Sequence, residues 1–260
     1  MHWLKPSNVG YAVRTYMEAV GYSTRLFFRL LFSLGATLKR PRLLTEQVHF
    51  MGNYSLGIIM ISGLFVGFVL SLQLYYTLQS YGSTEALGQL VALTLVRELG
   101  PVITALLFAG RAGTSLTAEI GLMKAGEQLA AMEMMAVDPI RRILAPRFWG
   151  AAMAMPVLAA IYSAVGIMGA WLVGVVMIGI DEGSFWSQMQ YGVHVWKDLG
   201  NGVIKSIIFG FAVSFIALLQ GYEAQPTPEG VARATTVTVV MASLTVLGLD
   251  FILTALMFSI

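Results

Sequence analysis

The chain has 260 residues, of which 57% are hydrophobic and only 12% are charged, against about 45–50% and 25% in an ordinary soluble domain. Its formal net charge is +2 and it has no cysteine, which excludes a disulfide framework, thiolate metal sites and a cysteine nucleophile. Because the apolar residues fall in blocks of about 20 or more, long enough for a helix to cross a bilayer, the composition predicts an all-α integral membrane protein.

The N-terminal segment, residues 1–48, is basic and contains several aromatic residues. Four charged residues, spaced by four, seven and four positions, share one face of a helix. They are Arg14, Glu18, Arg25 and Arg29. Arg29 interrupts the apolar run and no small-residue cleavage site follows it, which argues against a signal peptide. We expect an amphipathic helix lying in the membrane interface rather than a sixth span or a solvated basic tail.

Five apolar blocks follow, and we predict that each crosses the membrane as a helix. These blocks are residues 50–78, 87–110, 148–180, 203–219 and 235–260. The third is longer than a perpendicular crossing requires, so we expect it to tilt or to begin along the interface, and Pro156 permits a bend. In the first block, Gly63-x-x-x-Gly67 allows another helix to approach closely.

The second block carries two adjacent charges, Arg97 and Glu98. Neighbouring helical residues point about 100° apart, so each of the two needs a partner on another helix. If the span begins near Leu87, they lie roughly 15 Å along the axis, near mid-membrane. An ionised side chain at that depth costs about 2.5–3.5 kcal/mol and normally faces a bundle interior or a wet cavity.

A helix breaker follows these charges at Gly100 and Pro101. Proline has no amide hydrogen, so the carbonyl of Arg97 loses its helical donor, and we expect the helix to bend or open there. Irregular backbone at membrane depth is tolerated only against protein or a water-filled cavity. Charge and breaker together predict a polar cavity near residues 97–101.

The same charges have an alternative interpretation as interhelical ion pairs that fix the packing without any ligand. Lys205 could pair with Glu98, and Asp250 or Asp198 could pair with Arg97. The two interpretations overlap, because an ion pair can also line a path through the membrane.

Between the second and third blocks, residues 121–147 form the longest inner loop. Residues 127–136 contain good helix formers, and Asp138-Pro139 supplies a stop signal. Leu129, Met132 and Met135 share one face of this short helix. Because methionine adapts to a partner's groove, the helix is a candidate for docking on another protein; a helix packed along the membrane surface is the alternative.

The basic residues predict the orientation of the spans. With the N-terminus inside, the inner segments hold 13 lysines and arginines, whereas the outer loops hold only Lys197. Cytoplasmic flanks carry an excess of these residues, so we expect a cytoplasmic N-terminus. An odd number of spans then places the C-terminus on the other side.

Several kinds of chemistry are excluded by missing motifs. The chain has no G-x-x-x-x-G-K-[ST] loop for nucleotide phosphates, no H-E-x-x-H pair and no G-x-S-x-G nucleophile elbow. Its three histidines are too scattered to form a zinc site.

Four long segments make the sequence familiar. They are LVRELGPVITALLFAGRAG (95–113), TAEIGLMKAGEQLAAMEMMAVDPIRR (117–142), GYEAQPTPEGVARATT (221–236) and LGLDFILTALMF (247–258). Together they resemble the MlaE family, the permease subunits of ABC transporters that move phospholipids between bacterial membranes. The resemblance covers nearly the whole chain in order, as one permease domain over residues 1–260.

The resemblance implies partners that spacing alone does not show. It implies a homodimer in the bacterial inner membrane that encloses a lipid cavity, with a periplasmic C-terminus and a role in outer-membrane lipid asymmetry. It also implies a separate cytoplasmic ATPase that uses ATP and Mg²⁺, a periplasmic ring of MCE-domain subunits, and a STAS-domain subunit bound through the ATPase. This chain would then be a transport subunit and not an enzyme, with no cofactor of its own.

The resemblance also assigns roles to residues. The candidates for substrate binding are Arg97, Glu98, Leu99, Ile103 and Lys205. A lysine or arginine suits a phosphodiester and the apolar neighbours suit acyl chains, whereas we expect Glu98 to hold a basic residue in place. The helix in the inner loop matches the coupling helix that rests in the ATPase groove. Its candidate residues are Glu127, Leu129, Met132, Glu133, Met135 and Asp138.

Two departures from the family pattern affect these expectations. Val237 stands where relatives often carry a basic residue, so a contact at the inner end of the fifth span is in doubt. Ser71 and Leu74 stand where relatives tend to have glycine, which would reshape a cavity wall built by the first span.

Three other functions compete with lipid transport. The inner loop loosely resembles the loop by which permeases for small solutes grip their ATPases, but no glycine stands at the fitting distance. A membrane scaffold that only anchors a periplasmic ring is a second alternative. An intramembrane enzyme using Glu98 or Asp250 as acid or base is a third, and it lacks a nucleophile motif.

Overall fold

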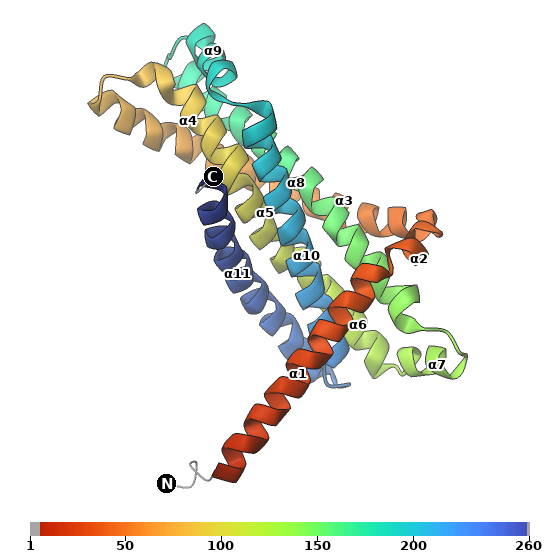
Figure 1. Ribbon diagram of the computed structural model, residues 1–260. Helices are drawn as coiled ribbons and strands as arrows, with labels where there is room; N and C mark the ends of the chain where they lie inside the picture. The colour runs from red at the N-terminus through yellow and green to blue at the C-terminus, as the bar shows by residue number, and fades with distance from the viewer. Residues whose placement is uncertain (1–5, 259–260) are drawn as a thin grey trace.

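The computed structural model describes residues 6–258, and this part of the chain contains helices and no β-strand. Five helical stretches are long and apolar enough to cross a membrane, which confirms the prediction of an all-α membrane protein. They are Pro41–Ser80, Thr84–Ala125, Ile140–Met177, Trp196–Glu223 and Pro228–Met257. The long helices lie side by side in an elongated bundle, with α9 at one end and α7 at the other (Figure 1).

The N-terminal helix α1 (Pro6–Phe32) is not among the spans. Its second half packs on the α7 end of the bundle, where Leu26 and Leu30 are buried in a cluster with Phe148 and Leu218. Trp149 donates a hydrogen bond to the carbonyl of Leu30 at 3.2 Å. The first half of α1 projects away from the bundle (Figure 1). A short helix, α2 (Leu34–Leu38), leads into the first span.

The first span is a single helix, α3 (Pro41–Ser80), which begins well before the apolar block at residue 50. Proline is favoured at the first helical position, and Arg42 pairs with Glu46 at 3.0 Å one turn later. Polar residues therefore extend the helix beyond the part that hydrophobicity predicts.

Close packing joins α3 to α8 (Ala145–Trp171). A Cβ atom on Gly67 would overlap the carbonyl oxygen of Gly166, and one on Gly63 would lie 3.0 Å from the carbonyl oxygen of Tyr162. The hydroxyl of Ser71 donates to the carbonyl of Ala170 at 3.0 Å. Ser71 thus lies in the contact between α3 and α8.

The second span is longer than the predicted block, reaching from Thr84 to Ala125. Its segments are η1 (Thr84–Ala86), α4 (Leu87–Leu93), η2 (Thr94–Leu99), α5 (Gly100–Phe108), η3 (Ala109–Gly113) and α6 (Thr114–Ala125). The helix continues past residue 110 because its basic residues find partners. Arg111 lies 5.2 Å from the centre of the Tyr54 ring, and Lys124 donates to the carbonyl of Tyr222 at 2.7 Å.

At Gly100-Pro101, where we expected the helix to bend or open, it widens and does not break. The segment η2 is π-helical, and the amide of Gly100 donates to the carbonyl of Leu95, five residues earlier. This wider turn lets Pro101 sit at the start of α5, where its missing amide hydrogen costs little. The chain thus absorbs the proline in a π-helical turn, a feature frequent at functional sites.

The remaining helices complete the bundle. They are α7 (Gln128–Met134), η4 (Ile140–Leu144), α8, η5 (Leu172–Met177), α9 (Glu182–Gly192), η6 (Val195–Leu199), α10 (Gly200–Glu223) and α11 (Pro228–Phe258). The helix α9 was not expected, and the carboxylate of Asp181 caps its start by accepting from the amide of Ser184 at 2.7 Å.

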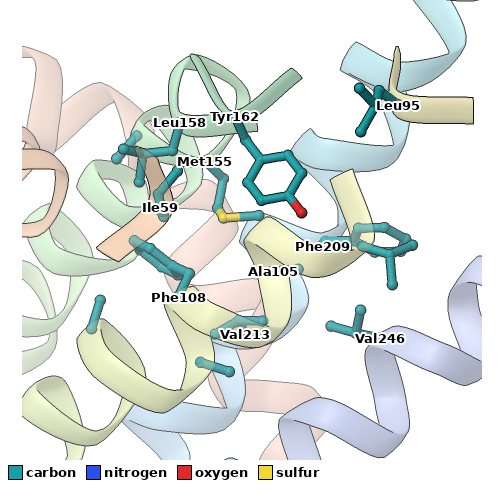
Figure 2. Close-up of a cluster of buried hydrophobic side chains, with 14 of the residues drawn as sticks. Ile59, Leu95, Ala105, Phe108, Met155, Leu158, Tyr162, Phe209, Val213 and Val246 are labelled. Carbon is teal, nitrogen blue, oxygen red and sulfur yellow. The ribbon is translucent and has the colours of Figure 1, made fainter. Parts of the chain in front are cut away.

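The bundle core lies between α3, α5, α8 and α10, with α11 on one side. Its largest buried side chains include Tyr162, Phe108 and Phe209, and Met155 and Val246 fill the space among them (Figure 2). The last span is the least buried of the five. In its apolar 18-residue stretch 11% of the residues are buried, against 28–50% in the other spans. One side of α11 is therefore left uncovered by the described part of the chain, residues 6–258.

Candidate functional site

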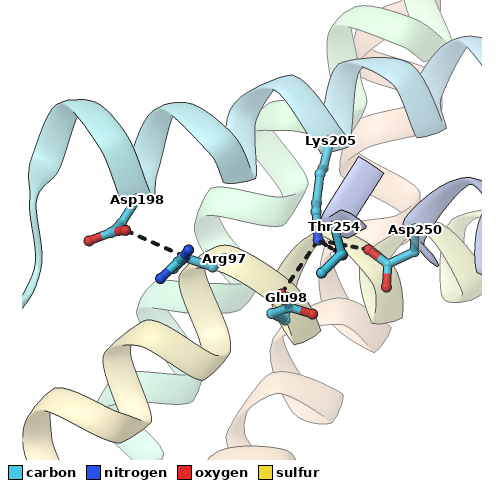
Figure 3. Close-up of polar contacts among 6 residues, drawn as sticks. All are labelled: Arg97, Glu98, Asp198, Lys205, Asp250 and Thr254. Atoms are coloured by element: carbon cyan, nitrogen blue, oxygen red, sulfur yellow. Dashed lines mark hydrogen bonds and ion pairs between the residues drawn. The ribbon is translucent and has the colours of Figure 1, made fainter. Parts of the chain in front are cut away.

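A cluster of charged side chains lies inside the bundle where the second, fourth and fifth spans meet (Figure 3). The ammonium of Lys205 lies 2.9 Å from Asp250 Oδ1, 2.7 Å from Thr254 Oγ1 and 3.8 Å from Glu98 Oε1. Arg97 Nε lies 3.4 Å from Asp198 Oδ1. We call these six residues the charged cluster.

The cluster agrees with the interpretation as interhelical ion pairs. Lys205 pairs with Glu98, and Arg97 pairs with Asp198 rather than with Asp250. Asp250 instead makes the shorter of the two ion pairs of Lys205, whose side chain is only 2% exposed. Because two positive groups face three carboxylates, the formal charge of the cluster is −1.

Helix geometry explains why these residues meet. Asp198 and Lys205 are seven residues apart, so they project from the same face of η6 and α10. Between them, Gly202 packs so closely on the second span that a Cβ atom would overlap the carbonyl oxygen of Val96. This contact brings Asp198 beside Arg97 and Lys205 beside Glu98.

Arg97 and Glu98 lie on the α9 side of the middle of the second span, whereas they lie near the middle of the apolar block 87–110 from which their depth was predicted. The second span begins at Thr84, and Asp198 is the third residue of the fourth span. Arg97 therefore meets the fourth span where that span begins. The reason for the difference is that the helix continues to Ala125, well beyond the end of the apolar block at residue 110.

A pocket of about 200 Å³ lies beside Pro101, next to the cluster. Its lining is mostly apolar and includes Val96, Pro101, Ala160, Ile167, Leu199 and Val203. The predicted polar cavity at this point is thus replaced by ion pairs and an apolar pocket. Such a lining suits a hydrocarbon chain better than a head group.

The other predicted residues of this region do not line that pocket. Leu99 and Ile103 are half-buried against the bundle core. Arg97 keeps 21% of its side chain exposed, in contrast to the buried Lys205. In this conformation Lys205 holds the spans together, whereas Arg97 and Glu98 keep part of their surface open.

The predicted docking residues in and beside the short helix α7 fall into a buried group and an exposed group. Leu129 is buried with Ile140 and Phe148, and Met132 packs partly against them. The exposed group comprises Glu127, Glu133, Met135 and Asp138. Leu129, Met132 and Met135 therefore do not present one common face to a partner.

The helix α7 is also shorter than residues 127–136, and the backbone explains why. Ala136 takes a left-handed conformation with φ 58°, and the amide of Val137 donates back to the carbonyl of Met132 at 2.9 Å. This pattern ends helices and leaves Met135 at the cap. Asp138 then begins the next segment by accepting from the amide of Ile140 at 3.0 Å.

Two contributors to the charged cluster were missed in the sequence. Thr254 follows Asp250 by four residues, so helical spacing alone could have shown that both reach the same partner. Gly202 gave a weaker signal, because its role depends on how closely α10 approaches the second span.

The five apolar spans, with ion pairs between them, define a multi-pass membrane protein of the helical-bundle class. The sequence model of the family described as permease MlaE matches residues 44–256. The chain therefore belongs to the MlaE permease family.

Individual relatives agree with this assignment. The chain is 55% identical over 252 residues, 97% of each chain, to the intermembrane phospholipid transport system permease protein MlaE of Haemophilus influenzae. It is 33% identical over 256 residues, 97% of each chain, to a probable ABC transporter permease protein of Rickettsia typhi. A probable ABC transporter permease protein of Synechocystis is 33% identical over 213 residues, 82% of this chain and 81% of the relative.

Proposed function

We propose that this chain is the permease subunit of an ABC transporter that moves phospholipids between the inner and outer membranes of a bacterium and so maintains outer-membrane lipid asymmetry. The observation that carries the proposal is its 55% identity, over almost the whole chain, to a relative named as a phospholipid transport permease. The apolar pocket beside the charged cluster supports it, because a phospholipid needs both kinds of surface.

The permease acts as a homodimer in this proposal. Four exposed apolar residues follow one stripe of α11 with spacings of four, three and four. They are Val240, Leu244, Leu247 and Phe251. This spacing is typical of a helix that packs against another helix, and a second copy of the chain would cover the stripe and enclose a space for lipid.

The energy comes from a separate ATPase subunit that binds ATP and Mg²⁺, since this chain has no phosphate-binding loop. We place the ATPase at the α7 end, on the cytoplasmic side of the inner membrane. The MCE-domain ring belongs at the α9 end, on the periplasmic side with the C-terminus, and a STAS-domain subunit joins through the ATPase. The many basic residues at the α7 end support this orientation.

The charged cluster has a mechanical role in this proposal. Glu98, Lys205 and Asp250 come from three different spans, so movement of one span against the others must break or exchange these pairs. Breaking one buried pair leaves an uncompensated charge and costs about 3–5 kcal/mol, which is within reach of a step coupled to ATP. Arg97, which is more exposed than Lys205, is the candidate for a phosphate.

Reconstitution of the chain with its partner subunits into two vesicle populations tests the proposal. Labelled phospholipid should pass between the vesicles only when ATP is hydrolysed, and Arg97→Ala should slow the transfer. Transfer that is equally fast without ATP would contradict the proposal. A complex that assembles normally and moves no phospholipid would favour the scaffold or the small-solute permease.

A further inference from the structure

A trough runs between the N-terminal helix α1 and the loop that follows α7. One part is a pocket of about 540 Å³ whose charged lining residues are Arg25, Arg29, Asp138 and Arg141. An adjoining pocket of about 490 Å³ shares Arg25, Arg29 and Asp138 and continues to Tyr22. Both are lined by residues of α1 and of the loop after α7 and by none of the charged cluster, and Figure 1 shows α1 crossing the end of the bundle that carries α7.

The charges of the larger pocket are not balanced. It has three guanidinium groups and one carboxylate, and that carboxylate is already engaged. Asp138 accepts from the amide of Ile140 at 3.0 Å and lies 3.5 Å from Arg141 Nε. Arg25 and Arg29 are one helical turn apart, where like charges repel each other. Within residues 6–258 neither makes an ion pair shorter than 4 Å, so an anion in this pocket would relieve the repulsion.

An apolar surface borders the same pocket. Phe28 and Phe32 line it, their side chains are 50% and 82% exposed, and their rings stack with centroids 6.2 Å apart. The trough also lies level with the ends of two spans, since Ile140 begins one and Tyr222 nearly ends another. Its ligand must therefore be anionic and apolar at once and available at the membrane surface.

The neutral phenol of Tyr22 lies at the far end of the trough. Burial, with Tyr222 and Glu223 nearby, raises the pKa of the Tyr22 phenol to about 12. The phenol therefore stays protonated and neutral, with Tyr222 as its hydrogen-bond partner, and adds no charge to the trough. Glu133 lines the same end, which directs the negative part of a ligand toward the arginines.

We propose that this trough binds an anionic phospholipid of the surrounding membrane. Its phosphate lies among Arg25, Arg29 and Arg141, and an acyl chain lies along Phe28 and Phe32. Arginine matches phosphate oxygens with two parallel hydrogen bonds, and basic amphipathic helices select anionic lipids at a membrane surface. Because α1 forms one wall and the loop after α7 forms the other, the bound lipid connects α1 with that loop.

Retention of lipid by the purified full-length chain, together with its partner subunits, tests this site. The complex is incubated in mixed micelles with equal amounts of phosphatidylglycerol and phosphatidylcholine, and the retained lipids are counted by native mass spectrometry. We expect a preference for phosphatidylglycerol that Arg25→Gln/Arg29→Gln lowers by about 20-fold, since each basic residue near an anionic membrane strengthens binding several-fold. Arg141→Gln, on the opposite wall, should lower it in the same direction.

The matched control is Arg14→Gln, on the same helix but outside the trough, where Arg14 pairs with Glu18 at 2.8 Å. It should keep the preference, and an equal loss in this variant would reduce the effect to general charge and overturn the site. An unchanged preference in Arg25→Gln/Arg29→Gln would also overturn it. Complete displacement of the lipid by excess inorganic phosphate would assign the trough to a soluble phosphate compound instead.

Loss of the ATPase subunit from Arg25→Gln/Arg29→Gln, with lipid preference intact, would show a protein contact and contradict the proposal. Equal thermal unfolding midpoints of the variants and the wild type are expected, because the substituted side chains are exposed. The readout is binding and not transport, so this site can fail while the proposed function stands, and the reverse also holds.

Discussion

Lys205 is the residue on which the interior of the bundle depends most. Its side chain is 2% exposed and it holds Asp250 and Thr254 on the fifth span and Glu98 on the second. An ion pair of this kind adds little to stability compared with apolar packing, but removal of one partner leaves a charge buried and alone. Lys205 is therefore the position where a single change has the largest expected effect.

Lys205→Met should destabilise the protein by about 3 kcal/mol, because Asp250 loses its counter-ion within the bundle. Lys205→Met/Asp250→Asn should recover part of that loss. Thermal unfolding of the purified protein in lipid nanodiscs measures both. Equal unfolding midpoints for Lys205→Met and the wild type would contradict the account of this pair.

Gly202 sets the distance between α10 and the second span. Gly202→Ala should destabilise the protein by about 1–3 kcal/mol, because the added methyl overlaps the carbonyl oxygen of Val96. Gly200→Ala is the matched control on the same helix, where no atom lies within 4 Å of the added methyl. It should be neutral or slightly stabilising. If the two variants unfold alike, the close contact at Gly202 does not carry the packing.

Among the helices, α7 has one side chain buried in the bundle and another, at its C-terminal cap, exposed where a partner could bind. Leu129 is 6% exposed inside the cluster that holds α1 to the bundle, whereas Met135 is 67% exposed at the end of α7. Truncating the two side chains should therefore have different consequences, although both residues belong to the same short segment.

Leu129→Ala should lower stability by about 2–3 kcal/mol, since it leaves a cavity among apolar side chains. Met135→Ala should leave stability unchanged and weaken recovery of the ATPase subunit with the purified chain. Thermal unfolding and co-purification distinguish the two. Normal ATPase recovery in both Met135→Ala and Met135→Asp would show that this end of α7 does not contact the ATPase.

The helices also show how much of the fold can be predicted from the sequence alone. Apolar block length correctly predicts five spans, because burial in lipid demands about 20 apolar residues for each helix. It misses the true ends of the helices, which continue through ion pairs and caps such as Arg42 with Glu46. It also misses the π-helical turn before Pro101, since local rules treat proline as a breaker and do not include the wider turn.

The charged cluster was predictable only in part for the same reason. Charges inside apolar blocks must find partners, so the residues themselves could be identified from the sequence. Which carboxylate meets which base depends on how α10 and α11 are rotated against η2, and spacing along one helix does not contain that information. Asp250 thus pairs with Lys205, and Arg97 is left to Asp198.

In the molecule as a whole, α11 is the least covered span, with 11% of the residues in its apolar 18-residue stretch buried. Because the chain has no cysteine, Leu247→Cys introduces one thiol on the exposed stripe. Under mild oxidation it should form a disulfide between two copies, as expected for a seam near a two-fold axis. Gel electrophoresis of membranes without reductant measures the dimer.

Val157→Cys on α8 is the matched control, since Val157 is exposed at 58% on a helix that packs mainly against α3 and α10. It should remain monomeric under the same conditions. Equal dimer formation at both positions would indicate random collision in the membrane and would remove the support for a homodimer through α11.

In the proposed mechanism phospholipid passes beside the charged cluster, and site-specific photocrosslinking can detect it there. A crosslinker at Leu99 in η2 and at Val203 in the apolar pocket is activated during ATP turnover with labelled phospholipid, with Ile61 on the exposed side of α3 as the control. We expect the crosslinker to capture more phospholipid at Leu99 and Val203 than at Ile61. Capture should depend on ATP at the first two positions only. Equal capture at all three positions, unaffected by ATP, would mean ordinary bilayer contact and would reduce the cluster to packing ion pairs.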